Sequence, residues 1–89
     1  MFKVTNNKGF AMTFANGYTV SVQWGGGNYC DNRNLPFRGV DAAVPPSKTA
    51  EVAVWDADDK WVTLSEHDDV IGYQTPEQVA AIIAKYSAI

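Results

Sequence analysis

The segment around Asn16-Gly17 constrains the fold of this chain more than any other feature. Large apolar residues alternate with small or polar ones in residues 10–15 and again in residues 18–24, a pattern typical of half-buried strands. An Asn-Gly pair between two such segments is a strong signal for a β-hairpin. The sequence therefore predicts an antiparallel strand pair with one apolar face.

The same pattern predicts the register of this hairpin. A two-residue loop would mix large and polar side chains on one face. A three-residue loop, residues 15–17, instead pairs Phe14 with Tyr18 and puts every large side chain on one face. Because a slip of one residue turns a whole strand over, burial favours the longer loop. We expect a type I turn with a bulge, in which Gly17 is left-handed.

A second hairpin is predicted from residues 49–55 and 60–64, although its turn signal is weaker. A three-residue loop at residues 57–59 would connect the two strands. The expected pairs are Val54 with Val62, Val52 with Leu64, and Trp55 with Trp61 on the reverse face.

The hydrophobic period changes at Thr75, where a helix is expected to begin. Thr75 suits the N-cap, Pro76 the first helical position, and Gln78 completes a capping box. An apolar stripe at spacings of three and four then predicts a helix to about Tyr86; it consists of Val79, Ile82, Ile83 and Tyr86.

Residues 2–5 and 70–73 add two short extended segments. The expected fold is α+β: an antiparallel sheet of about five strands, built from two hairpins, with one C-terminal helix packed on a face. The 89 residues of the chain are predicted to form one domain, residues 1–89.

Charge and composition exclude several function classes. A net charge of −3 argues against a basic protein that binds nucleic acid through phosphates. A single cysteine excludes a disulfide framework and suits a reducing cytoplasm, and no motif predicts a metal or other cofactor. We expect no signal peptide, because residues 1–8 contain no long apolar stretch and no cleavage signature. We expect no membrane partner either, because the chain contains no run of about 18 apolar residues.

The long segment between Trp24 and Thr49 has no regular pattern, and such segments are often functional. It opens with three glycines, and it holds both arginines of this acidic chain, whose guanidinium groups suit a carboxylate or phosphate. The alternative is a purely local role, in which the glycines allow bends and the asparagines cap their own backbone. The candidate binding residues of this segment are Asn28, Tyr29, Asn32, Arg33 and Arg38.

Two catalytic or metal arrangements are considered and set aside. Cys30 and His67 are each unique, but a lone cysteine is more often a small buried hydrophobe than a nucleophile. The acidic run at residues 56–59 lacks calcium ligands at the later loop positions, because Lys60 and His67 stand there. The sequence therefore predicts no enzyme.

The three tryptophans are too large to share one small core. Trp24, Trp55 and Trp61 are accordingly candidate binding residues. We expect the helix to cover Trp55 and Trp61. If it covers the opposite face of the sheet, these side chains instead form an exposed platform for a base, a partner protein or an oligomer interface.

A signature spans most of the chain. It consists of Phe-Ala-Asn-Gly-Tyr-Thr-Val-Ser-Val-Gln-Trp-Gly at residues 14–25, Asn-Tyr-Cys at 28–30, Asn-Arg at 32–33, Ala-Glu-Val-Ala-Val-Trp-Asp at 50–56 and Gly-Tyr-Gln-Thr-Pro-Glu-Gln-Val at 72–79. These runs resemble small proteins of uncharacterised activity encoded by tailed bacteriophages. The resemblance implies a phage accessory protein that acts in the cytoplasm of the host bacterium.

Two functions are expected on these grounds. The first is a non-enzymatic protein that binds and inhibits a host or defence component, since short acidic phage proteins often act in this way. The alternative is a binder of a nucleotide-like small molecule, which would use the loop of residues 25–33 and stack the base on aromatic side chains.

Overall fold

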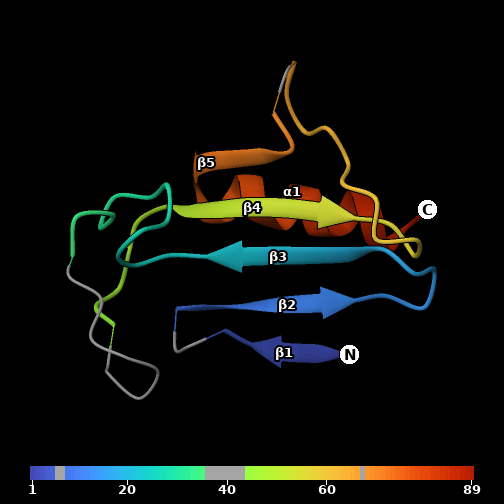
Figure 1. Cartoon of the computed structure of the whole chain (residues 1–89), viewed down its shortest axis with the longest axis horizontal. Helices are drawn as coiled ribbons and strands as arrows, with labels where there is room; N and C mark the ends of the chain where they lie inside the picture. Colours follow the sequence, from blue (N-terminus) through green and yellow to red (C-terminus); the bar gives the residue numbers. More distant parts are fainter. Residues whose placement is uncertain (6–7, 36–43, 67) are drawn as a thin grey trace.

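The computed structural model of the chain describes residues 1–5, 8–35, 44–66 and 68–89. Within these ranges five strands form one antiparallel sheet in chain order, and a helix follows the last strand (Figure 1). The elements are β1 (Phe2–Val4), β2 (Gly9–Thr13), β3 (Thr19–Gln23), β4 (Ala50–Trp55), β5 (Val70–Gln74) and α1 (Pro76–Ser87). The predicted α+β fold is therefore confirmed.

The β2–β3 hairpin has the predicted register. Met12 pairs with Val20, and the amide of Phe14 donates to the carbonyl oxygen of Tyr18 at 2.9 Å. Gly17 closes the three-residue loop with a φ of +92°, so it is left-handed as expected. The alternation of large and small side chains was enough to select this register, because the alternative would have exposed one strand's apolar residues.

The second hairpin is only partly as predicted. Its loop at residues 57–59 is confirmed, since Asp56 donates to the carbonyl oxygen of Lys60 at 2.9 Å and Trp55 bridges Trp61. The amide of Val62 still donates to the carbonyl oxygen of Val54 at 2.8 Å, in the predicted register, but residues 62–64 form no strand, so the predicted strand at residues 60–64 is wrong. The partner of Val52 is consequently Ile71 of β5, and not Leu64.

Helix α1 begins and ends close to its predicted limits. The hydroxyl of Thr75 accepts from the amide of Gln78 at 3.3 Å, and the Gln78 side chain accepts from the amide of Thr75 at 2.8 Å. This capping box satisfies amides that have no partner inside the helix. Pro76 occupies the first turn, where its missing N–H costs nothing.

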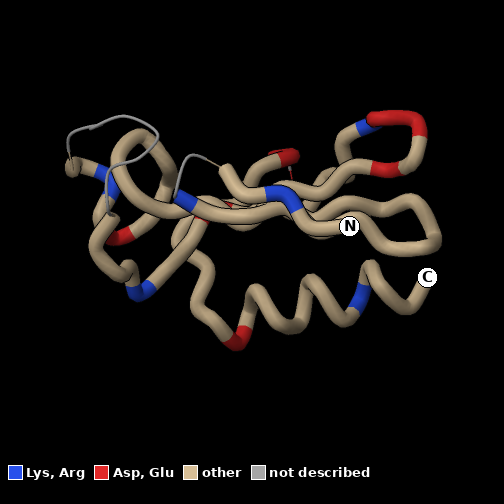
Figure 2. The backbone as a smooth tube through the Cα atoms, turned by 90° about the horizontal axis from the view of Figure 1, so that it is seen from below, with Lys and Arg blue, Asp and Glu red and all other residues tan. Residues whose placement is uncertain are grey.

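The core lies between α1 and one face of the sheet. Its buried members are Val20, Val22, Ala50, Val52, Val54 and Tyr86. The helix contributes Val79, Ile82 and Ile83 and contacts β3, β4 and β5. Figure 2 shows that α1 covers one side of the sheet only, so the opposite face has no second layer over the described residues.

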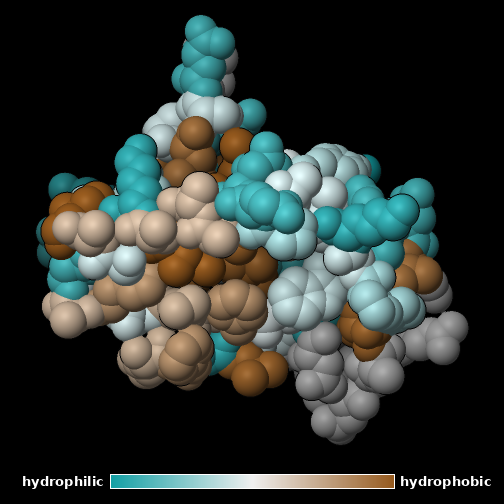
Figure 3. All heavy atoms as spheres, turned by 180° about the vertical axis from the view of Figure 1, so that it is seen from behind, coloured by the Kyte–Doolittle hydropathy of each residue, from teal (hydrophilic) through white to brown (hydrophobic). Residues whose placement is uncertain are grey.

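The helix does not extend over β1. Phe2 pairs with Met12 and so faces the helix side, yet it is 76% exposed. Apolar side chains accordingly reach the surface on this side (Figure 3). On the helix side, the sheet therefore exposes apolar side chains at its β1 edge. On the other side, the whole face opposite α1, called the open face below, is uncovered over the described residues.

Candidate functional site

Trp55 and Trp61 lie on the open face of the sheet. Their ring centroids are 5.6 Å apart at an interplanar angle of 54°, and Trp61 is 55% exposed. The expectation that the helix covers this pair is wrong. The helix packs on the valine face of β4, where Val52 and Val54 are fully buried, and strand alternation turns Trp55 to the other side.

The hairpin tip beyond the two tryptophans is acidic and well ordered by its own hydrogen bonds. One carboxylate oxygen of Asp56 accepts from the amides of Asp58 at 2.9 Å and Lys60 at 3.0 Å. This acidic tip stands on the side of the sheet away from the helix (Figure 2). It therefore borders the open face instead of extending the core.

A cavity of about 310 Å³ lies on the open face between this tip and the N-terminal strands. It is lined by Met1, Lys3, Ala11, Thr13, Gly17, Thr19, Trp55, Asp56, Ala57 and Asp59. The floor comes from small side chains of β2 and β3, and the hydroxyls of Thr13 and Thr19 bond each other at 2.8 Å. Because these hydroxyls bond each other and carry no charge, the floor of the cavity is nearly neutral.

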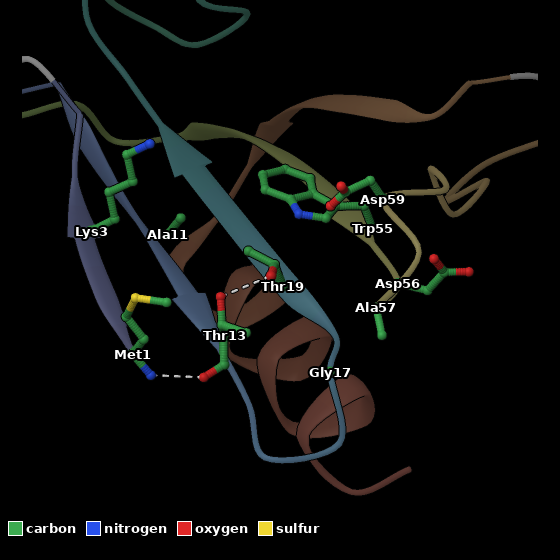
Figure 4. A pocket seen from close by; sticks show the side chains of 10 residues that line it. All are labelled: Met1, Lys3, Ala11, Thr13, Gly17, Thr19, Trp55, Asp56, Ala57 and Asp59. Atoms are coloured by element: carbon green, nitrogen blue, oxygen red, sulfur yellow. Dashed lines mark hydrogen bonds between the residues drawn. The ribbon is translucent and has the colours of Figure 1, made fainter.

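The two sides of this cavity differ in chemistry. Figure 4 shows the ring of Trp55 along one side, with the carboxylate of Asp59 turned toward it and that of Asp56 turned away. Lys3 and Met1 stand on the opposite side, on and next to β1. An aromatic face beside a carboxylate is an arrangement that can hold a cation.

The asparagines of the 25–35 segment serve the segment's own structure. The side chain of Asn32 accepts from the amide of Gly25 at 2.8 Å and donates to the carbonyl oxygen of Pro45 at 3.1 Å. Asn28 donates to the carbonyl oxygen of Trp24 at 2.8 Å. These bonds match the local role that the sequence left open for the two residues.

Tyr29 and Arg33 form a separate pair near the start of β4. The guanidinium of Arg33 lies 4.8 Å from the centroid of the Tyr29 ring, and Tyr29 is 49% exposed. The amide of Tyr29 donates to a carboxylate oxygen of Glu51 at 2.7 Å, which attaches the segment to β4. The candidate residue Arg38 lies outside the residues that the structure describes.

Trp24 is separated from the other two tryptophans by the sheet. It packs edge to face on Phe10, with centroids 6.4 Å apart, against the core on the helix side. A second cavity of about 310 Å³ lies there, between Trp24 and the helix residues Val79 and Ile83. The structure thus brings Trp55 and Trp61 together and Tyr29 with Arg33, but it does not unite the candidates in one site.

Cys30 is buried, with 1% of its surface exposed. Its sulfur lies 3.1 Å from the side-chain oxygen of Asn32 and 3.6 Å from the carbonyl oxygen of Gly25. A buried thiol with these partners packs as a small side chain. His67, the proposed partner in a dyad, is not among the residues that the structure describes.

We therefore expect the Cys30 thiol to react only when the 25–35 segment opens. Its rate of modification by an aromatic disulfide reagent should fall at least about 100-fold below that of the urea-unfolded chain, because reaction requires local unfolding. The measurement is the absorbance of the released thiolate. Equal rates in the folded and unfolded chain would contradict the buried placement.

Sequence reasoning missed the cavity residues Thr13, Thr19 and Asp59. A signal was present for the first two, since small or hydroxyl side chains occupy alternate positions in β2 and β3, on the face without large residues. No sequence signal could place Asp59, because its position over the open face depends on how the hairpin tip bends.

The described parts of the chain contain no group of three or more potential metal ligands. They also contain no helix of the length and hydrophobicity that a membrane crossing requires. Comparison with known proteins gives no match to a family model, a curated protein or a solved structure. The resemblance to bacteriophage proteins accordingly stays a prediction.

Proposed function

We propose that the protein is a non-enzymatic binding protein that docks another protein on the open face of its sheet. The observation that carries this proposal is the tryptophan pair on a face that the helix leaves uncovered. Tryptophan is enriched among the residues that dominate interface energetics. An exposed Trp61 packed on Trp55 offers such an anchor without a large loss of side-chain freedom.

The finer proposal is that the partner is a host or defence component of a bacterium, which the protein inhibits in the host cytoplasm. It is supported by the sequence resemblance to small phage proteins and by the net charge of −3, which suits a basic protein partner. The burial of Cys30 supports a binding role over one that depends on this thiol.

The test is co-purification from a bacterial lysate, followed by mass spectrometry, with three baits. They are the unmodified chain, Trp61→Ser, and Phe2→Ser as a matched control. Phe2 is also an exposed aromatic residue, but it lies on the helix side of the sheet. We expect a stoichiometric partner with the unmodified chain and with Phe2→Ser.

Trp61→Ser should weaken this binding by at least about tenfold, the effect typical of an interface hot spot. Circular dichroism should show that both variants keep the fold, because neither side chain belongs to the buried core. A partner that is retained by Trp61→Ser, or the lack of any stoichiometric partner, would refute the proposal.

A further inference from the structure

We propose that the cavity beside Trp55 receives an arginine or lysine side chain from a basic segment of the docked protein. This inference rests on the proposed function and names the chemistry of the partner. The cavity of about 310 Å³ lies at the lower end of the volumes typical of ligand pockets. One long side chain is a suitable occupant for such a space.

The wall of the cavity at Trp55 suits a cation. The ring of Trp55 forms one side, and an indole face is the best aromatic surface for attracting a guanidinium or ammonium group. The carboxylate of Asp59 is turned toward the same ring (Figure 4). A side chain that enters here would lie on the ring with its charge directed at this carboxylate.

The surrounding charges favour the same partner. Asp56, Asp58 and Asp59 form the tip that borders the cavity, and no ion pair engages Asp59 within the described ranges. Negative charge around an open surface speeds encounter with a basic segment and disfavours nucleic acid or another acidic protein. The two positive groups of the lining, Lys3 and the N-terminal ammonium of Met1, stand on the opposite side of the cavity from Trp55, and the ammonium donates to the carbonyl oxygen of Thr13 at 2.8 Å.

A comparison of the two hairpin tips identifies substitutions at position 59 that test binding without disturbing the fold. Asp59 closes its loop with a φ of +61°, at the position that Gly17 occupies in the first hairpin with a φ of +92°. Glycine and asparagine both accept this conformation. Asp59→Gly and Asp59→Asn should therefore keep the turn while removing the carboxylate from the cavity.

The experiment is an NMR titration of the full chain with a short synthetic peptide of alternating arginine and glycine. The three indole N–H signals serve as reporters. We expect saturable shifts at Trp55 and Trp61 but not at Trp24, which lies on the other side of the sheet. The same peptide with citrulline in place of arginine keeps the shape without the charge and should not bind.

Asp59→Asn and Asp59→Gly should each lower the affinity for the arginine peptide by about tenfold. This is the loss expected when a charge-assisted hydrogen bond and the cation–π contact that it positions are removed. Asp58→Asn is the matched control, since Asp58 carries the same charge in the same tip but does not line the cavity. Its effect should stay below about twofold, as for a screened surface charge.

Equal binding of the citrulline peptide, or unchanged affinity in Asp59→Asn, would overturn the cation site. So would indole shifts that depend on protein concentration without peptide, because they would assign this face to a second copy of the chain. If capture from lysate depends on Trp61 but not on Asp59, the proposed binding function stands and only the cation site fails.

Discussion

Replacing Gly9 with alanine should destabilise the protein by about 3 kcal/mol, the range reached when a substitution overpacks a buried position. Gly9 is buried at the start of β2, opposite Gln23 of β3. A Cβ atom there would overlap the carbonyl oxygen of Val22 and lie 2.9 Å from the Cα atom of Gln23. Both atoms belong to backbone that is held in the sheet, so neither can yield without loss of β2–β3 pairing.

The measurement is urea unfolding followed by tryptophan fluorescence, with the midpoint and slope fitted together. Gly27→Ala is the matched control, because Gly27 has a φ of +88° but no atom of the described residues lies within 4 Å of an added Cβ. Its free energy of unfolding should fall only by the cost of an alanine in the left-handed conformation, about 1 kcal/mol. Equal losses in the two variants would show that the contact with β3 does not limit position 9.

Local rules explain the parts of the fold that the sequence predicts well. The register of the first hairpin follows from the alternation around Phe14 and Tyr18, which are only a few residues apart. The helix start follows from Thr75, Pro76 and Gln78, which satisfy each other within one turn. In both cases the interacting residues are neighbours in the chain, so the local sequence is enough to predict the structure without knowledge of the tertiary fold.

The side of the sheet that the helix covers could not be predicted in the same way. Strand β4 has apolar residues on both faces, with Val52 and Val54 on one and Ala53 and Trp55 on the other. Its orientation is decided by pairing with β3, where Val20 lies opposite Val54. These strands are joined by residues 24–49, whose sequence has no regular pattern, so no turn chemistry predicts their register.

The wrong strand at residues 60–64 has a related cause. The segment alternates well and follows a genuine turn, yet β5 takes the neighbouring place beside β4. Competition between two candidate neighbours is settled by packing across the whole sheet and not by the local pattern. The cavity on the open face also depends on tertiary packing, because it forms where Gly17 and Ala57 of the two hairpin tips meet.

Asn16 shows how a local signal can hide a tertiary role. Its side-chain amide donates to the main-chain oxygens of Tyr86 at 2.7 Å and Ile89 at 2.9 Å, and its oxygen accepts from the amide of Tyr18 at 3.0 Å. The hairpin tip thus satisfies oxygens at the end of α1 that have no partner within the helix. The turn between β2 and β3 therefore also holds the C-terminal end of the helix.

Asn16→Ala should therefore destabilise the protein by about 2 kcal/mol at neutral pH, the sum expected for the lost hydrogen bonds. Asn16→Asp should cost more, although aspartate keeps the bond to Tyr18. Its carboxylate cannot donate to Tyr86 or Ile89, and it adds negative charge at the negative end of the helix dipole.

Thermal unfolding of both variants at several pH values measures this difference. The excess loss of Asn16→Asp over Asn16→Ala should shrink as the pH falls, because a protonated carboxyl regains a donor and loses its charge. Comparing the two variants at each pH cancels the titration of the natural carboxylates. An Asn16→Asp variant as stable as the unmodified chain at neutral pH would show that the hairpin tip does not hold the helix end.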